Sequence, residues 1–224
     1  MDSDTAEKNS EELFQIAKNL VNNHHVFEAM DFFEQAAEMG NMKAMKELVV
    51  WFLRAQRYCK TENVIRYAKT LADSGDVESM KNLAIIYRGK DILKSIEWFE
   101  KVAELGSSYA MRELGQIYCR GTYIEKNIQK AIEWYEKAAE LGNFDAMHDL
   151  AVTYQRGNGV EKNIQKAIEW YEKAAKLDDW ESMRALAKIY RDGDGVEKNE
   201  KKAAELLKRI DDKLDTLLNG VISY

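Results

Sequence analysis

Apolar residues recur with a helical period along most of this chain. In the stretch AMRELGQIY (110–118), Met111, Leu114 and Tyr118 stand three and four residues apart, which places them on one face of a helix. The stretch AIEWYEKAA (131–139) shows the same spacing in its Ala, Trp and Tyr residues. Proline is absent, and Glu, Lys, Ala and Leu are abundant. The pattern predicts amphipathic helices in pairs, not a β-rich chain.

The helical pattern is repeated along the sequence. Aligned on Met-x-x-Leu, the copies begin at Met45, Met80, Met111, Met147 and Met183, in steps of 35, 31, 36 and 36 residues. A second motif follows as IEWFEKVAELG (96–106), IEWYEKAAELG (132–142) and IEWYEKAAKLD (168–178). Residues 125–139 and 161–175 are identical, both reading EKNIQKAIEWYEKAA. Such identity indicates one geometry used twice.

Each repeat is predicted to be a helical hairpin of a helix A and a helix B. Glycines in RGTYIEKN (120–127) and RGNGVEKN (156–163) end helix A, and the asparagines that close these loops are placed to cap helix B. Those caps are Asn127, Asn163 and Asn199. The shorter loop RGKD (88–91) accounts for the 31-residue step, because loops tolerate deletions best.

Stacked hairpins share one core, because a single hairpin cannot bury both of its faces. We therefore expect an all-α fold, a right-handed α/α superhelix of about six helix-turn-helix repeats with a C-terminal capping helix. A disordered or frayed N-terminus is expected for residues 1–8, and a capping helix extension and tail for 211–224. The solenoid covers 9–210, in units of about 9–41, 42–76, 77–107, 108–143, 144–179 and 180–210.

Charge and cysteine content narrow the class of protein. The net charge of −6 over 224 residues gives no electrostatic footprint for nucleic acid. No apolar run approaches the roughly 18 residues of a membrane span, and the polar, acidic opening MDSDTAEKNSEELF is unlike a signal peptide. Cys59 and Cys119 form no disulfide framework, which favours two reduced, partly buried thiols and a cytoplasmic location.

The repeat resembles the Sel1-like repeat, a relative of the tetratricopeptide repeat with a slightly longer unit. The motif is clearest in AMHDLAVTYQRGNGVEKNIQKAIEWYEKAAKL (146–177) and degenerate in the first two units. The resemblance implies an α/α superhelix that serves as a protein–protein adaptor or scaffold, often in bacteria, with no general catalytic set. One secreted bacterial branch carries a cysteine pair in every repeat, and this sequence lacks such pairs.

The residues themselves offer little for catalysis, and we predict that the protein is not an enzyme. No Cys/His/Asp cluster has the spacing of a metal site, and nothing forms a nucleophile–base pair. Catalytic, cofactor-binding and metal-binding residues are therefore predicted to be none. The alternative from another class is a hydrolase that uses groove carboxylates such as Glu113 and Asp149 on consecutive repeats.

Binding residues are predicted where the repeat leaves positions free. Counted from the motif Met as position 0, positions +1, +5 and +9 of helix A point away from its apolar arc, toward the expected concave groove. Position +1 is basic or can become so in every copy, +5 is often aliphatic, and +9 is often Arg. This face suits a protein or peptide that carries acidic groups and a few apolar anchors. The predicted partner-binding residues are Lys46, Val50, Arg54, Lys81, Ile85, Arg112, Gln116, Arg120, His148, Val152, Arg156, Arg184 and Lys188.

Two readings of this surface stay open. The basic +1 side chains could pair with nearby Glu residues of the same helix and bind nothing else. The main interface could instead lie in the divergent first two units. There the set Trp51, Phe52, Leu53, Tyr58 and Tyr67 is more aromatic than the repeat requires. The leading function is a non-enzymatic scaffold, and the alternative is a tight-binding inhibitor or immunity-type protein for one partner. The sequence identifies neither the partner nor the oligomeric state.

Overall fold

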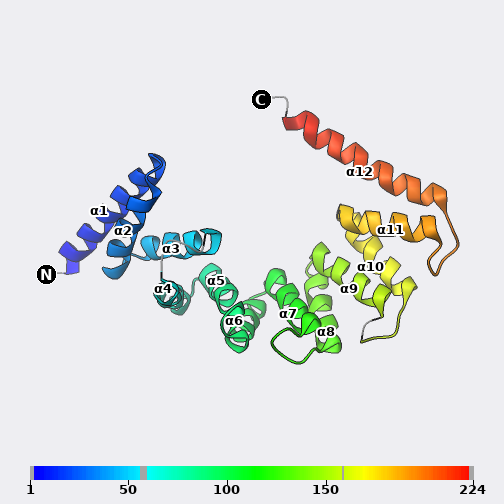
Figure 1. The fold of residues 1–224 in the computed structure, drawn as a ribbon, viewed down its shortest axis with the longest axis horizontal. Helices are drawn as coiled ribbons and strands as arrows, with labels where there is room; N and C mark the ends of the chain where they lie inside the picture. Colours follow the sequence, from blue (N-terminus) through cyan, green and yellow to red (C-terminus); the bar gives the residue numbers. More distant parts are fainter. Residues whose placement is uncertain (1–2, 56–59, 158, 222–224) are drawn as a thin grey trace. The chain divides into compact units, whose positions relative to one another are not determined.

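The computed structural model describes residues 3–55, 60–157 and 159–221, which form twelve α-helices and no strand (Figure 1). The odd-numbered helices are the A helices and the even-numbered ones are the B helices, as the repeat predicts. Residue 3, where the first helix begins, falls within the segment 1–8 expected to be frayed. The helices are α1 (Ser3–Asn22), α2 (Val26–Glu38), α3 (Met42–Ala55), α4 (Thr61–Asp73), α5 (Val77–Arg88), α6 (Ile92–Glu104), α7 (Ser108–Arg120), α8 (Ile128–Glu140), α9 (Phe144–Arg156), α10 (Ile164–Lys176), α11 (Trp180–Asp192) and α12 (Glu200–Val221).

The chain divides into two compact units. Residues 1–105 form the N-terminal unit, and residues 106–224 form the C-terminal unit. Within each unit, every helix packs mainly onto the helices before and after it in the chain, the arrangement of an α/α solenoid. The predicted all-α repeat fold is confirmed.

The predicted helix boundaries are confirmed where the motif is strongest. The side chains of Asn127 and Asn163 accept hydrogen bonds from the backbone N–H groups of Lys130 and Lys166, each at 2.9 Å. Asn199 caps α12 in the same way. These bonds satisfy amides that the first turn of a helix leaves without a partner. Each cap therefore sets the residue at which a B helix begins.

The A–B loop also joins neighbouring repeats. Gly159 has a φ of +84°, and a Cβ built on it would lie 2.5 Å from the Cγ1 of Ile128, the first residue of the preceding B helix. Gly195 stands in the same relation to Ile164, at 2.9 Å. A side chain on either glycine would collide with the previous repeat. The second glycine of the GNG and GDG loops therefore has a packing role, since it lets the loop lie against that helix.

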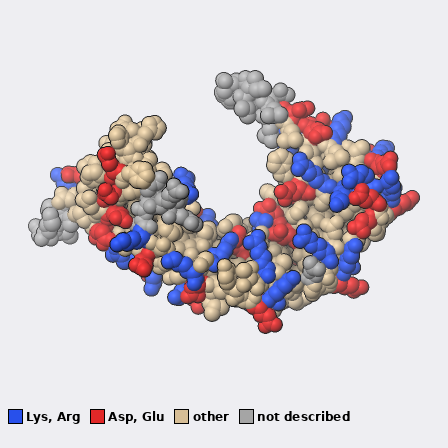
Figure 2. Space-filling view, in the orientation of Figure 1, with Lys and Arg blue, Asp and Glu red and all other residues tan. Residues whose placement is uncertain are grey.

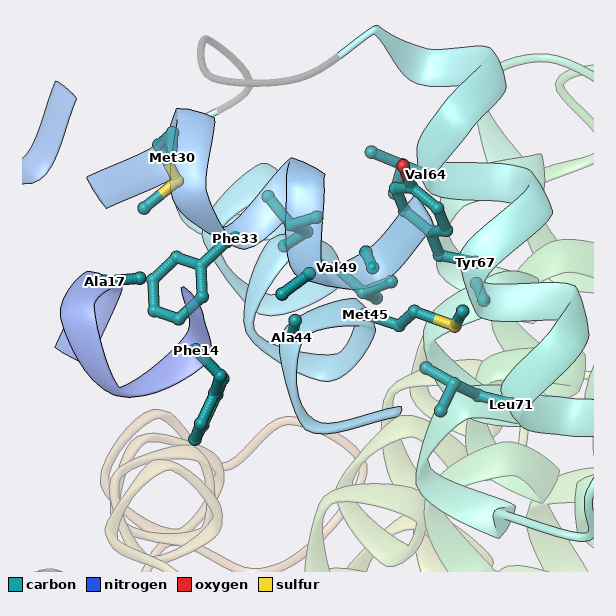
Figure 3. Packing of buried hydrophobic residues seen from close by; sticks show 14 of the residues in the cluster. Phe14, Ala17, Met30, Phe33, Ala44, Met45, Val49, Val64, Tyr67 and Leu71 are labelled. Carbon is teal, nitrogen blue, oxygen red and sulfur yellow. The ribbon is translucent and has the colours of Figure 1, made fainter. Parts of the chain in front are cut away.

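The N-terminal unit is held by one apolar cluster drawn from α1 to α5 (Figure 3). Phe14 of α1 packs against Phe33 of α2 with ring centroids 5.7 Å apart, and Met45 of α3 lies toward Leu71 of α4. Phe33 and Leu71 are fully buried. Burial of a side chain of this size contributes roughly 1.5–3 kcal/mol.

This packing includes the apolar residues Trp51, Phe52 and Leu53 of α3. All three are partly buried against the cluster, so they support the core of the divergent repeats. Tyr67 is 1% exposed, and its hydroxyl donates a hydrogen bond to Glu38 at 2.6 Å. Tyr58 and Cys59, one of the two predicted thiols, lie outside the described residues.

The C-terminal unit ends in the predicted long helix. Ile210 of α12 is buried in the cluster that contains Met183 and Leu186 of α11. Arg209 donates a hydrogen bond to the backbone oxygen of Ala175 at 3.0 Å and pairs with Asp178 at 2.8 Å. These contacts tie α12 to the turn between α10 and α11.

Candidate partner-binding surface

The side chains at positions +1, +5 and +9 of the A helices form what we call the A-helix face, and we describe it in each unit separately. Lys and Arg mix with Asp and Glu over the visible surface of both units (Figure 2). Charge alone therefore does not mark a site. The pairing of each predicted residue decides which of them remain available to a partner.

In the N-terminal unit, the +1 side chains reach the beginning of the next A helix. Lys46 Nζ of α3 lies 2.8 Å from Asp76 Oδ1, and Asp76 is the N-cap of α5. Burial would raise the pKa of Asp76, but hydrogen bonds from Lys46 and Ser79 outweigh it and hold the pKa below its usual range. Lys81 of α5 pairs with Glu78 of its own helix at 2.6 Å.

The same contact occurs with reversed charge at the beginning of the chain. Glu11 of α1 stands 35 residues before Lys46, so it takes the +1 position of the first repeat. It accepts hydrogen bonds from Lys43 Nζ at 3.2 Å and from Asn41 Nδ2 at 3.4 Å, both at the beginning of α3. Position +1 of the first repeat is therefore acidic instead of basic, and the side chain that it contacts on the next A helix, Lys43, is basic instead of acidic.

In the C-terminal unit, Arg112 of α7 bridges two carboxylates of α9. Its Nε lies 2.9 Å from Asp149 Oδ2, and its Nη1 lies 3.4 Å from Asp145 Oδ2. Gln116, at position +5, donates a hydrogen bond to the same Asp149 oxygen at 3.3 Å. Arg112 and Asp149 are each about a quarter exposed (24% and 23%), so this pair is only partly screened by water.

His148 makes the corresponding contact from α9 to α11. Its Nδ1 lies 3.0 Å from Ser182 Oγ and 3.6 Å from Asp179 Oδ2, and Asp179 is the N-cap of α11. The imidazole also meets the edge of the Tyr171 ring, with centroids 5.4 Å apart. Burial raises the pKa of Tyr171 to about 12, so its phenol remains protonated at neutral pH.

The aliphatic +5 residues are less available than the sequence suggests. Val152 is partly buried and packs against the apolar cluster of α9 to α12. Val50 and Ile85 in the N-terminal unit are half-buried as well. These side chains contribute to packing between repeats and offer a partner only a fraction of their surface.

Five of the predicted residues are exposed and make no ion pair with any described residue. They lie at +9 of three A helices and at +1 and +5 of the last A helix. These five are Arg54, Arg120, Arg156, Arg184 and Lys188.

Sequence reasoning missed that most of the +1 side chains join one repeat to the next. The signal was present in the sequence as charge complementarity between position +1 and the first turns of the following helix A. Glu11 faces Lys43, Lys46 faces Asp76, and Arg112 faces Asp145. Comparing each +1 residue with the next repeat, instead of with its own helix, would have shown it.

The described residues contain no group of three or more His, Cys, Asp or Glu side chains that could hold a metal ion. The two carboxylates considered for a hydrolase do not stand free. Asp149 is held by Arg112 and Gln116, and Glu113 is 6% exposed.

Cys119 is a partly buried free thiol. None of the described helices is long and apolar enough to span a membrane.

Comparison with solved structures finds close likenesses in fold. A Sel1 repeat protein from Oxalobacter formigenes is 29% identical, with a TM-score of 0.64 over 87% of this chain and 82% of that one. The protective antigen c5321 of uropathogenic Escherichia coli, which displays an SLR fold, is 24% identical with a TM-score of 0.68. That match covers 95% of this chain and 49% of the antigen.

No curated protein matches the sequence. The family model of the Sel1 repeat matches residues 27–41, 77–107, 108–143, 144–179 and 180–210. These segments cover more than half of the chain, and they coincide with the last four repeats and the second half of the first. The chain belongs to the Sel1 repeat family.

Proposed function

We propose that this protein is a non-enzymatic binding scaffold, and that the A-helix face of its C-terminal unit binds an acidic segment of a partner protein. Sel1 repeat proteins bind proteins, and this membership sets the class of function. The surface and the chemistry of the partner are argued from the cations of this face.

The observation that carries the proposal is the excess of unpaired cations on this face. Arg120, Arg156, Arg184 and Lys188 are exposed there and form no ion pair with described residues. Asp149, an acid beside this face, already binds Arg112 and Gln116. In a chain with a net charge of −6, four free cations on one face favour an acidic ligand.

Arginine suits such a ligand because its planar guanidinium can bind a carboxylate through two parallel hydrogen bonds. Apolar contact is available beside the cations. Phe144 and Trp180, the first residues of α9 and α11, are 43% and 50% exposed. We propose that these aromatic side chains, in place of Val152, contact the apolar groups of the partner.

The test is partner capture with a charge-reversed chain. Wild type and the triple variant R156E/R184E/K188E serve as baits in lysate of the source cell, and captured proteins are quantified by mass spectrometry. A matched control, K176E/K201E/K208E, changes the net charge equally at exposed lysines of α10 and α12.

We expect a partner that wild type and the control retain and the triple variant loses. Calorimetric titration with that purified partner should show affinity at least roughly tenfold lower for the triple variant, because several charge-assisted hydrogen bonds are lost. Equal affinity for all three chains would place the interface elsewhere. Circular dichroism of each variant confirms that the helices remain.

A further inference from the structure

On α1, α3, α7 and α9, one stripe of side chains contacts the next A helix of the same unit. It consists of positions −3, +1 and +5, which lie four residues apart and therefore share one side of a helix. We call it the seam stripe. On α7 it is Ser108, Arg112 and Gln116, and each of the three is hydrogen-bonded to the N-cap or to the second turn of α9.

Helix α9 offers its N-cap and two later acids to that stripe. Asn143 donates to Ser108, and Asp145 and Asp149 bind Arg112. The acids thus stand two and six residues after the cap. In two other seams the +1 side chain contacts the N-cap residue itself: His148 of α9 contacts Asp179 of α11, and Lys46 of α3 contacts Asp76 of α5.

On α11 the stripe is not covered by any further A helix of the described residues. On α11 it consists of Trp180, Arg184 and Lys188, and all three side chains are exposed. The equivalent residues of α7, Arg112 and Gln116, are half-buried by α9. The stripe that would receive a further A helix therefore faces solvent and is cationic at both polar positions.

An apolar pocket lies next to this stripe. Trp180 and Met183 of α11 line it together with Ile210 and Leu214 of α12. Lys213 and Asp178 also line the pocket, and they form an ion pair at 2.7 Å. A helix that lay along α11 could place an apolar side chain in this pocket.

We propose that the seam stripe of α11 binds the N-terminal turns of a partner's α-helix, one with a capping Asp or Asn and acids two and six residues after the cap. The inference rests on the proposed function and narrows its ligand from an acidic segment to a helix of this pattern. Three internal seams, one of them with its charges reversed at Glu11 and Lys43, show that the fold recognises helix beginnings by charge complementarity.

The probe is a synthetic peptide with the sequence of residues 143–156, the helix that the α7 stripe binds within the chain. It is acetylated and constrained by a lactam bridge, since an isolated helix of this length is marginal in water. Two comparison peptides complete the set. One is a scrambled, unconstrained peptide of identical composition, and the other carries Asp145→Lys and Asp149→Lys.

Binding to the full chain is measured by fluorescence anisotropy, and the contact is located by NMR chemical-shift changes. We expect the helical peptide to bind wild type at least tenfold more tightly than the scrambled peptide does. The double variant R184E/K188E should lose this binding and gain affinity for the lysine peptide, as the charge-reversed seam at Glu11 predicts. The control variant K201E should bind as wild type does.

The outcomes separate this inference from the proposed function. Equal binding of helical and scrambled peptides, lost in R184E/K188E, would retain acidic recognition by this face and overturn recognition of a helix. Equal binding to wild type and R184E/K188E would overturn the assignment to α11. If neither acidic peptide binds at millimolar concentration, the seam inference fails, and capture by the triple variant still decides the proposed function.

Discussion

At the scale of single residues, glycines with the same backbone conformation have different roles. Gly142, in the turn before α9, has a φ of +79° and open space where a Cβ would be. Gly159 has a φ of +84° and would bring a Cβ within 2.5 Å of Ile128. The first glycine serves the backbone alone, whereas the second also lets two repeats approach.

Alanine substitutions should separate these two roles. G142A is expected to lower the free energy of unfolding by about 1–2 kcal/mol, because a residue with a Cβ is strained at positive φ. G159A should cost about 1–3 kcal/mol more, because the new methyl group also displaces Ile128. Urea denaturation monitored by circular dichroism measures both. Equal losses of unfolding free energy in the two variants would show that the loop moves away from Ile128 without an energetic penalty.

Asp178 occupies a turn position that is a glycine in the other repeats. It has a φ of +67° in the turn before α11. Ion pairs with Lys213 and Arg209 hold the pKa of its carboxyl below the usual range. Asp tolerates the left-handed conformation better than most residues. Asp in place of Gly at this position therefore adds ion pairs to α12 with little conformational strain in the backbone.

At the scale of helices, Asp76 has two functions, since it caps α5 and binds Lys46 of α3. Its pKa is below the usual range, so the folded state favours the ionised carboxylate. The resulting stability is present above the unfolded pKa of about 3.9 and is lost as the pH falls through the lower folded value.

The variant D76N should therefore make the free energy of unfolding less dependent on pH in the acidic range. Asn still caps the helix but carries no charge, so the ion pair is lost while the cap remains. Unfolding free energies from urea titrations between pH 3 and pH 7 should fall less steeply for D76N than for wild type. D73N, at an exposed residue of α4, is the control. Identical slopes for wild type and D76N would contradict the assignment.

The seam between α7 and α9 should appear as energetic coupling. In a double-mutant cycle of R112Q and D149N, we expect a coupling energy of about 0.5–2 kcal/mol, because the partners touch and are only a quarter exposed. The pair Lys162–Asp194, at 3.6 Å and about half exposed, should show coupling near zero. Both cycles are measured by urea denaturation, and similar coupling in the two would argue against a structural seam.

Periodicity and capping residues predicted the helices well, because they are local properties. Asn127 and Asn163 cap as expected, and Gly157 ends α9 in the left-handed conformation. The seam could not be derived from periodicity within one helix. Arg112 looks solvent-exposed on a helical wheel, and only the approach of α9 makes it a bridge to Asp149.

At the scale of the molecule, the two units contain separate apolar clusters. The described cluster of the N-terminal unit runs from Leu13 to Trp98, and the two clusters of the C-terminal unit begin at Met111 and at Ala151. The division at residue 105 also falls in the turn between two repeats, not within a hairpin. Stability in solenoids is approximately a sum over repeats and their interfaces. We therefore expect each unit to fold separately.

The fragment 106–224 should accordingly fold when expressed alone. We expect a helical circular dichroism spectrum and one cooperative urea transition, since α7 to α12 keep their clusters and their capping helix. A matched fragment, 128–224, begins inside the hairpin and removes α7 from α8. There Tyr135 loses the close packing that Gly115 permits, so the transition should broaden and shift to lower urea.

The opposite result would have a direct consequence for function. If 106–224 remained unfolded, the A-helix face of the C-terminal unit could not be tested apart from the N-terminal unit. Binding would then have to be measured on the full chain. If it folds, the same fragment should bind the acidic helical peptide as the full chain does, because Trp180, Arg184 and Lys188 all lie within it. Loss of that binding in a folded fragment would show that the first three repeats contribute to recognition.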